Sequence, residues 1–271
     1  MNTLHLFGDS FTEGHNLDLS FPWYKVWKEL RGGNLPPTWH EILSKKIGMD
    51  CNINAIAGSS NIETFHTICQ KCDSFKKGDI IIINWTYLHR FRWAAEFHDE
   101  NGVKVINPTT GKPIPYWVRM GSTIAEHCKF YISESTQTEI AINKSEQGLH
   151  VEEIYDYEKI IDLLCEKIGC DVYYWSMDEK IINSLPKEKL NQKKYICNQY
   201  IGNYNILPTE PNIGHHYTLF REVYKRGGMN IQEETKFEIP DTHLGESGHR
   251  IQADLFYEYL TNNQTFKNKL I

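Results

Sequence analysis

The sequence predicts a three-layer α/β/α fold around a parallel sheet of about five strands, in one domain that spans residues 1–271. Short apolar runs alternate along the chain with longer segments of helical periodicity, which is typical of a parallel, doubly wound sheet. The run Ile80–Ile83 contains no polar residue, as expected for a strand buried on both faces. Together these patterns predict helices on both faces of the sheet.

The N-terminal part is expected to form a strand, a helix and a second strand. Thr3–Phe7 is an apolar run that stops at a Gly-Asp-Ser sequence, which indicates a buried strand ending in a loop. Trp39–Ile47 has helical spacing and is followed by Gly48, a residue favoured at helix C-termini. Cys51–Ala57 is expected to be the second strand.

The same alternation continues to the end of the chain. Ile62–Phe75 predicts a helix before the third strand, and Tyr157–Ile168 predicts another before a fourth strand at Asp171–Ser176. A fifth strand is expected near Tyr204–Leu207. The last helix is expected to bury one face made of Ile251, Leu255 and Tyr259.

About seventy residues between the third strand and the following helix are too many for an ordinary crossover. Turn signals such as Asn101-Gly102 flank short β-prone pieces such as Val103–Ile106. We expect residues 89–150 to form an inserted lid or small subdomain that contains a hairpin.

Charge and composition argue against several classes of partner. The net charge is −6, and the Lys and Arg residues form no long runs, so we expect neither nucleic acid nor a membrane as partner. No apolar run approaches the roughly 18 residues that span a bilayer, and the first residues lack the pattern of a secretion signal. Seven cysteines, an odd number, do not form a dense disulfide framework. A cytoplasmic location is therefore expected.

Three loops that follow predicted strands carry candidate functional residues. The first three strands end near Ser10, Gly58 and Asn84, and open α/β sheets bind ligands at the carboxyl ends of their strands. A serine nucleophile needs a base, a group that orients the base, and donors for the oxyanion. Near the other end of the chain, Asp241 and His243 precede the last helix and supply the orienting carboxylate and the base.

Three segments resemble the sequence blocks of the SGNH (GDSL-like) hydrolase family. Leu6–Gly14, LFGDSFTEG, is similar to the N-terminal Gly-Asp-Ser block, and Asn54–Asn61, NAIAGSSN, is similar to the second block. Asp241–His249 is similar to the C-terminal block, in which a catalytic His is followed several residues later by a Gly-His pair. The blocks occur in the family's order, and this matched order extends over essentially the whole chain, with the insertion outside it.

The resemblance implies a flavodoxin-like fold and a catalytic triad. Ser10 corresponds to the nucleophile, and His243, oriented by Asp241, corresponds to the base. The backbone N–H groups of Ser10 and Gly58 correspond to two donors of the oxyanion hole. The resemblance implies no cofactor and no metal. Cys69 and Cys72 form a Cys-x-x-Cys pair, but the sequence has no second pair at zinc-ligand spacing.

Two features depart from the family pattern. Asp241 precedes His243 by two residues, whereas the family usually has three. The third block, Gly-x-Asn-Asp, is absent after the third strand. Asn84 is expected to supply the missing side-chain donor, with Thr86, or the backbone donors alone, as alternatives.

The expected activity is that of a serine esterase acting on a small-molecule or glycan ester, such as an O-acetyl group on a sugar. An aromatic cluster that includes Trp85 and Trp117 can stack on sugar rings, or simply pack the insertion onto the domain. Two alternatives use the same scaffold, an acyltransferase with the same triad and a non-catalytic glycan-binding module. His249 is the alternative base, and Asp9 is expected to hold the nucleophile loop through backbone hydrogen bonds.

Overall fold

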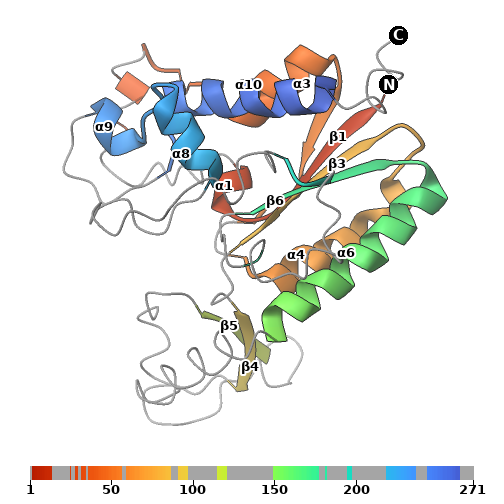
Figure 1. Ribbon diagram of the computed structural model, residues 1–271. Helices are drawn as coiled ribbons and strands as arrows, with labels where there is room; N and C mark the ends of the chain where they lie inside the picture. Colours follow the sequence, from red (N-terminus) through yellow and green to blue (C-terminus); the bar gives the residue numbers. More distant parts are fainter. Residues whose placement is uncertain are drawn as a thin grey trace, which may run out of the picture.

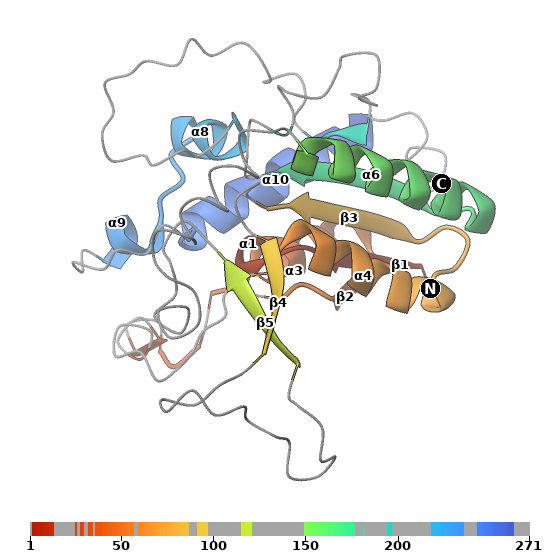
Figure 2. The same ribbon diagram turned by 90° about the horizontal axis from the view of Figure 1, so that it is seen from below.

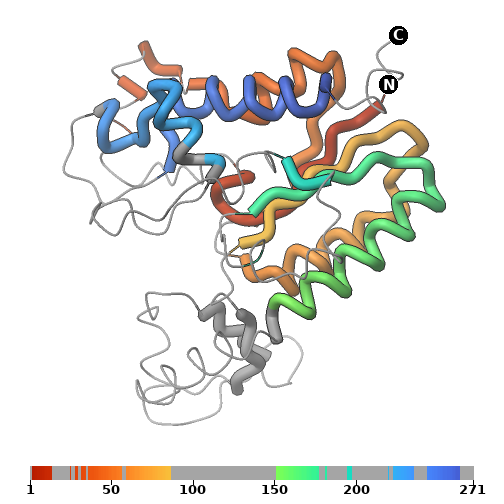
Figure 3. The backbone as a smooth tube through the Cα atoms, viewed as in Figure 1, coloured from red at the N-terminus to blue at the C-terminus, as the bar shows by residue number. Residues whose placement is uncertain are grey.

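The computed structural model describes most of the sheet and the helices around it (Figure 3). The described residues are 2–13, 25, 28–29, 32–34, 36–56, 59–86, 91–96, 115–120, 149–176, 181, 194–196, 218–235 and 243–262.

The centre of the fold is a four-stranded sheet in the order β2-β1-β3-β6, in which every neighbouring pair is parallel (Figure 1). Its strands are β1 (Thr3–Phe7), β2 (Asp50–Ile53), β3 (Ile80–Trp85) and β6 (Asp171–Ser176). The β-branched residues of β3 are buried on both faces of the sheet, as the unbroken isoleucine run predicts. The predicted α/β fold class is confirmed.

The outer edge of β6 has a further parallel contact. Tyr195 forms an isolated parallel bridge with Tyr174, and the N–H of Ile196 donates to the carbonyl of Tyr174 at 2.8 Å. The chain therefore runs beside β6 in the direction expected of a fifth strand. The predicted strand at Tyr204–Leu207 lies outside the described residues.

Helices cover both faces of the sheet, which gives the three predicted layers (Figures 1 and 2). One layer contains α3 (Trp39–Ile47) and α10 (Glu246–Asn262), and the other contains α4 (Asn61–Lys71) and α6 (Leu149–Ile168). Shorter helices complete the described chain: α1 (Ser10–Glu13), the 3₁₀ turn η1 (Cys72–Ser74), α8 (Thr218–Lys225) and α9 (Ile231–Thr235).

Local sequence sets the ends of α3 and α4. The N–H of Thr38 donates to the Glu41 carboxylate at 2.8 Å, and the N–H of Ser60 donates to the Glu63 carboxylate at 2.9 Å. Both are capping boxes, which satisfy backbone donors that the first turn of a helix leaves free. Gly48, with φ of 68°, closes α3 in the left-handed conformation that favours glycine.

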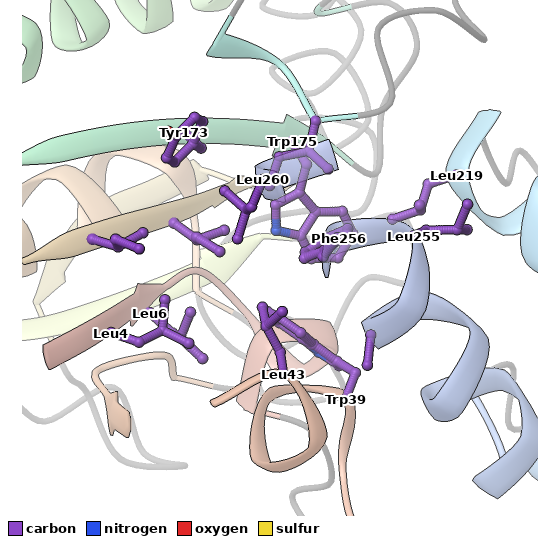
Figure 4. Packing of buried hydrophobic residues seen from close by; sticks show 14 of the residues in the cluster. Leu4, Leu6, Trp39, Leu43, Tyr173, Trp175, Leu219, Leu255, Phe256 and Leu260 are labelled. Carbon is purple, nitrogen blue, oxygen red and sulfur yellow. The ribbon is translucent and has the colours of Figure 1, made fainter. Parts of the chain in front are cut away.

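The core between the sheet and the α3–α10 layer is built around three large aromatic rings (Figure 4). Trp39, Trp175 and Phe256 are fully buried or nearly so. The Phe256 ring lies edge-on to Trp39 at 4.9 Å and to Trp175 at 5.7 Å between ring centroids. Edge-to-face contacts of this kind add to the free energy gained from burial, so one aromatic cluster joins two helices to β6.

The start of α6, the end of β2 and the buried face of α10 differ from the sequence-based prediction. The helix predicted from Tyr157 begins eight residues earlier at Leu149, because Val151 and Ile154 are buried and extend its apolar face. β2 ends at Ile53 rather than at Ala57. On α10, Leu255 is buried as predicted, and Phe256 and Leu260 join it in the core, so the buried face of α10 is wider than the predicted one.

The region of the predicted insertion contains two described strands. β4 (Phe91–Glu96) and β5 (Pro115–Met120) pair antiparallel and form a sheet of their own. They lie within residues 89–150, whereas the segment Val103–Ile106 lies outside the described residues. The role of this region as a lid remains a prediction.

A buried carboxyl group, that of Glu158, lies between α6 and the sheet. The Trp85 Nε1–H donates to its Oε1 at 2.8 Å, and the Tyr195 hydroxyl donates to the same oxygen. Burial raises the pKa of Glu158 to about 7, although both hydrogen bonds favour the charged form. Glu158 therefore changes its protonation state in the folded protein near neutral pH.

Replacing Glu158 by Gln should remove a pH dependence of stability. In the unfolded chain the Glu158 carboxyl titrates near its ordinary pKa, so between that value and about 7 the folded protein binds the additional proton. The free energy of unfolding should therefore fall as pH rises through this window, by about 3 kcal/mol in total. Urea unfolding at pH 5 and pH 8 measures the difference, with Glu152→Gln, at an exposed position of the same helix, as control. An unchanged pH dependence in Glu158→Gln would assign the effect to another group.

Among the described residues, none of the helices has both the length and the apolar character needed to cross a membrane.

Candidate active site

The candidate nucleophile, Ser10, lies just past the end of β1, where it begins α1 (Figure 1). Gly8 makes the connection between strand and helix, with φ of 147°. A Cβ atom on Gly8 would lie 2.5 Å from Thr12 Oγ1 and 2.7 Å from Asn84 Cβ. Glycine is thus required here by both its conformation and the close approach of β3. The resulting sharp turn leaves Ser10 partly exposed.

His243 approaches Ser10 from the other end of the chain. It lies just before α10, and its Nε2 is 2.9 Å from Ser10 Oγ. In the tautomer with no proton on Nε2, the Ser10 hydroxyl donates to the imidazole. This distance is within the range that direct proton transfer requires. The structure therefore brings together the two residues that the sequence predicts as nucleophile and base.

The His243 ring stacks on Phe11, a residue that the sequence-based prediction did not include. The two ring centroids are 4.5 Å apart and the ring planes are inclined by 22°. Trp39 Nε1–H donates to the carbonyl of Phe11 at 3.0 Å, which fixes the backbone beside Ser10. Phe11 thus gives the imidazole a flat, buried surface. Phe11 directly follows the Gly-Asp-Ser sequence, and this position was the indication in the sequence that it could contact the site.

Asp9 holds the nucleophile loop in place through hydrogen bonds that its carboxylate accepts. Its side chain is fully buried, and its Oδ1 accepts hydrogen bonds from the N–H of Phe11 at 3.1 Å and from Asn84 Nδ2 at 2.8 Å. Its Oδ2 accepts from the Thr86 hydroxyl at 2.6 Å. The expected backbone hydrogen bond is confirmed, and the carboxylate also ties the end of β1 to β3.

Asn84 and Thr86, the side chains expected as possible oxyanion donors, both contact Asp9. Both side chains are fully buried and donate to Asp9. Asn84 belongs to β3 itself, where it pairs with Trp175, so its side chain lies beneath the nucleophile loop rather than beyond the end of the strand. In this structure Asn84 and Thr86 support the loop, and the role of Asn84 as an oxyanion donor remains a prediction.

A second pair of hydrogen bonds joins the start of α4 to the end of β3. Asn61 Oδ1 accepts from the N–H of Thr86 at 2.7 Å, and Asn61 Nδ2 donates to the carbonyl of Thr86 at 3.1 Å. The Ser59 hydroxyl donates to the carbonyl of Gly8 at 2.8 Å. The loops after the first three strands therefore form one connected polar layer. The polar Ser-Ser-Asn sequence in the second block was the indication in the sequence that this loop could bond its neighbours.

His249, the alternative base, occupies a different place. It is buried on α10, and its Nδ1 accepts a hydrogen bond from the N–H of Trp39 at 3.3 Å. It thereby satisfies a free donor in the first turn of α3. This contact indicates a structural role for His249 in the packing of α10 against α3.

Two predicted site residues, Asp241 and Gly58, lie outside the described residues, and their roles remain predictions. Within the described ranges, no group of three or more His, Cys, Asp or Glu side chains is arranged to hold a metal ion.

Comparisons with known proteins give limited information. No protein-family model matches the sequence, and no curated protein matches it. Among solved structures, the chain is similar to a protein from Desulfitobacterium hafniense DCB-2, provisionally described as a lipolytic protein of the G-D-S-L family. The likeness covers 96% of this chain and 100% of that chain, at 9% sequence identity and a TM-score of 0.47. It is too distant to assign a family or an activity.

Proposed function

We propose that this protein is a serine esterase that hydrolyses a short acyl ester through an acyl-enzyme on Ser10. The observation that carries the proposal is the 2.9 Å distance between Ser10 Oγ and His243 Nε2. The pair lies at the carboxyl ends of the parallel strands, where open α/β sheets bind ligands. A partly exposed hydroxyl beside an imidazole is the arrangement that activates serine as a nucleophile.

The reaction proceeds in two halves. In the first, Ser10 Oγ attacks the ester carbonyl while His243 Nε2 takes the hydroxyl proton, and His243 then returns that proton to the departing alcohol. In the second, His243 takes a proton from water, the hydroxide attacks the acyl-enzyme, and Ser10 leaves with the proton from His243. The acid is released and the free enzyme is restored.

Further residues complete the proposed machinery. Asp241 orients the His243 imidazole and stabilises its charged form, and the backbone N–H groups of Ser10 and Gly58 bind the oxyanion. Phe11 supports the same charged form, because a cation over an aromatic face is stabilised by the ring. The proposed substrate class is a short acyl ester such as an O-acetyl group on a glycan, which rests on the motif resemblance and the aromatic residues of the insertion.

Labelling with a fluorophosphonate probe tests the proposal, because such probes react with activated serines. Mass spectrometry of the digested protein is expected to find the label on Ser10, and Ser10→Ala should not be labelled. Hydrolysis of p-nitrophenyl acetate should accompany the labelling. Absence of both would favour the non-catalytic binding module. Labelling together with acetyl transfer to an added sugar in preference to water would identify an acyltransferase.

A further inference from the structure

The turn that carries His243, residues 243–247, is held by a segment that precedes it in the sequence. The N–H of Ile231 donates to the carbonyl of His243 at 2.9 Å, and the N–H of Gly245 donates to the carbonyl of Met229 at 2.9 Å. Asn230 and Leu244 form an antiparallel bridge between these two contacts. The backbone from the His243 carbonyl to Gly245 is therefore fixed to the residues at the start of α9.

Glu234, on α9, adds a charged contact to the same turn. Its Oε2 accepts from the N–H of Glu246 at 2.8 Å, and its Oε1 accepts from both the N–H and the hydroxyl of Ser247 at 2.7 Å. These N–H groups begin α10, a helix of 17 residues. A carboxylate at this end of a helix satisfies free backbone donors and interacts favourably with the helix dipole.

Glycine at position 245 allows this contact. A Cβ atom on Gly245 would lie 2.3 Å from Glu234 Cδ and 2.5 Å from its Oε2. Any other side chain would push the carboxylate away from the turn. The Ser247 hydroxyl, which donates to Glu234, also accepts from the N–H of Met229 at 3.0 Å, so the segment and the turn are joined from both sides.

We propose that Glu234 is a positioning residue for the catalytic base. It holds the backbone of residues 243–247 so that His243 Nε2 stays within hydrogen-bonding distance of Ser10 Oγ. The inference rests on the proposed function of Ser10 and His243. Glu234 acts through the turn and takes no part in proton transfer, so its loss should displace the base without removing it. A displacement of about 1 Å at a reacting group can lower a rate about 100-fold.

Two single variants disturb the same contact in different ways. Glu234→Ala removes the carboxylate, and Gly245→Ala forces it aside while leaving its charge in place. Each should lower kcat about 10- to 100-fold and leave KM within about twofold, because substrate binding does not depend on the position of the base. The rate of fluorophosphonate labelling at Ser10 should fall in the same proportion.

The double variant Glu234→Ala/Gly245→Ala provides the sharper test. Once Glu234 is shortened, the new methyl at position 245 has no carboxylate to displace, so the double variant should be no slower than Glu234→Ala alone. Gln232→Ala is the matched control, because Gln232 lies two residues before Glu234 on the same short helix, at an exposed position. It should keep kcat within about twofold.

Three outcomes would overturn the positioning role: wild-type kcat in Glu234→Ala, losses in the double variant that multiply, or an equal loss in Gln232→Ala. Circular dichroism shows whether each variant folds, and Glu234→Gln, which keeps the side chain's size, replaces Glu234→Ala if that variant does not. If wild-type Ser10 is neither labelled nor active, the proposed function fails. The positioning role is then decided by the NMR signal of the His243 ring, which should shift or broaden in Glu234→Ala and remain unchanged in Gln232→Ala.

Discussion

Replacing Ser10 by Ala is expected to lower kcat for ester hydrolysis about 10⁴-fold or more. The substitution removes the oxygen that forms the acyl-enzyme, and the partly exposed position at the start of α1 can accept alanine without a change in packing. The measurement is kcat at saturating substrate, with circular dichroism to show that the fold is intact. Activity within tenfold of wild type would exclude an acyl-enzyme on Ser10.

His243→Ala should cause a loss of similar size. The two residues act as one unit, so the double variant Ser10→Ala/His243→Ala should be little slower than either single variant. His249→Ala is the control, because the His249 ring bonds the backbone of Trp39 instead, and it should keep most of the activity. If His249→Ala abolished turnover while His243→Ala did not, the base would be His249.

Replacing Asp9 by Ala is expected to have the largest effect on stability. Three buried donors, the N–H of Phe11 and the side chains of Asn84 and Thr86, would lose their acceptor. Because each unsatisfied buried donor costs about 1–3 kcal/mol, we expect the free energy of unfolding to fall by roughly 3–5 kcal/mol. kcat should fall as well, since the loop that presents Ser10 loses its support.

Urea unfolding measures this loss, and two further variants separate its causes. Asp9→Asn keeps one acceptor oxygen and should lie between wild type and Asp9→Ala. Asp73→Ala, at an exposed position, should change the free energy of unfolding by less than about 0.5 kcal/mol. A loss below about 1 kcal/mol in Asp9→Ala would show that the three donors find other acceptors.

Where an apolar pattern is bounded by clear turn or cap signals, the sequence predicted the element ends correctly. The strands Thr3–Phe7 and Asp171–Ser176 and the helix Trp39–Ile47 were placed to the residue. The start of α6 was not, because the buried Val151 and Ile154 near that start are separated by two glutamates. Burial by the sheet, rather than local periodicity, decides where that helix begins.

The candidate site could be predicted where the chemistry lies in motifs, and not where it depends on packing. The pairing of Ser10 with His243 follows from two short motifs, one at the carboxyl end of β1 and one directly before α10. The position of Asn84 depends on a single buried acceptor, Asp9, and on how far β3 continues past the end of β1. Glu234 lies on a five-residue helix, too short for its sequence pattern to predict a contact with the turn.

The separation of 233 residues between Ser10 and His243 has a consequence for the timing of activity during synthesis. Ser10 leaves the ribosome well before His243, as an ordinary serine hydroxyl with no neighbouring imidazole to activate it. The described strands β1, β2, β3 and β6 all precede His243 in the sequence, so they are made before it. A nascent chain therefore has no Ser10–His243 pair until the segment that carries His243 has been made.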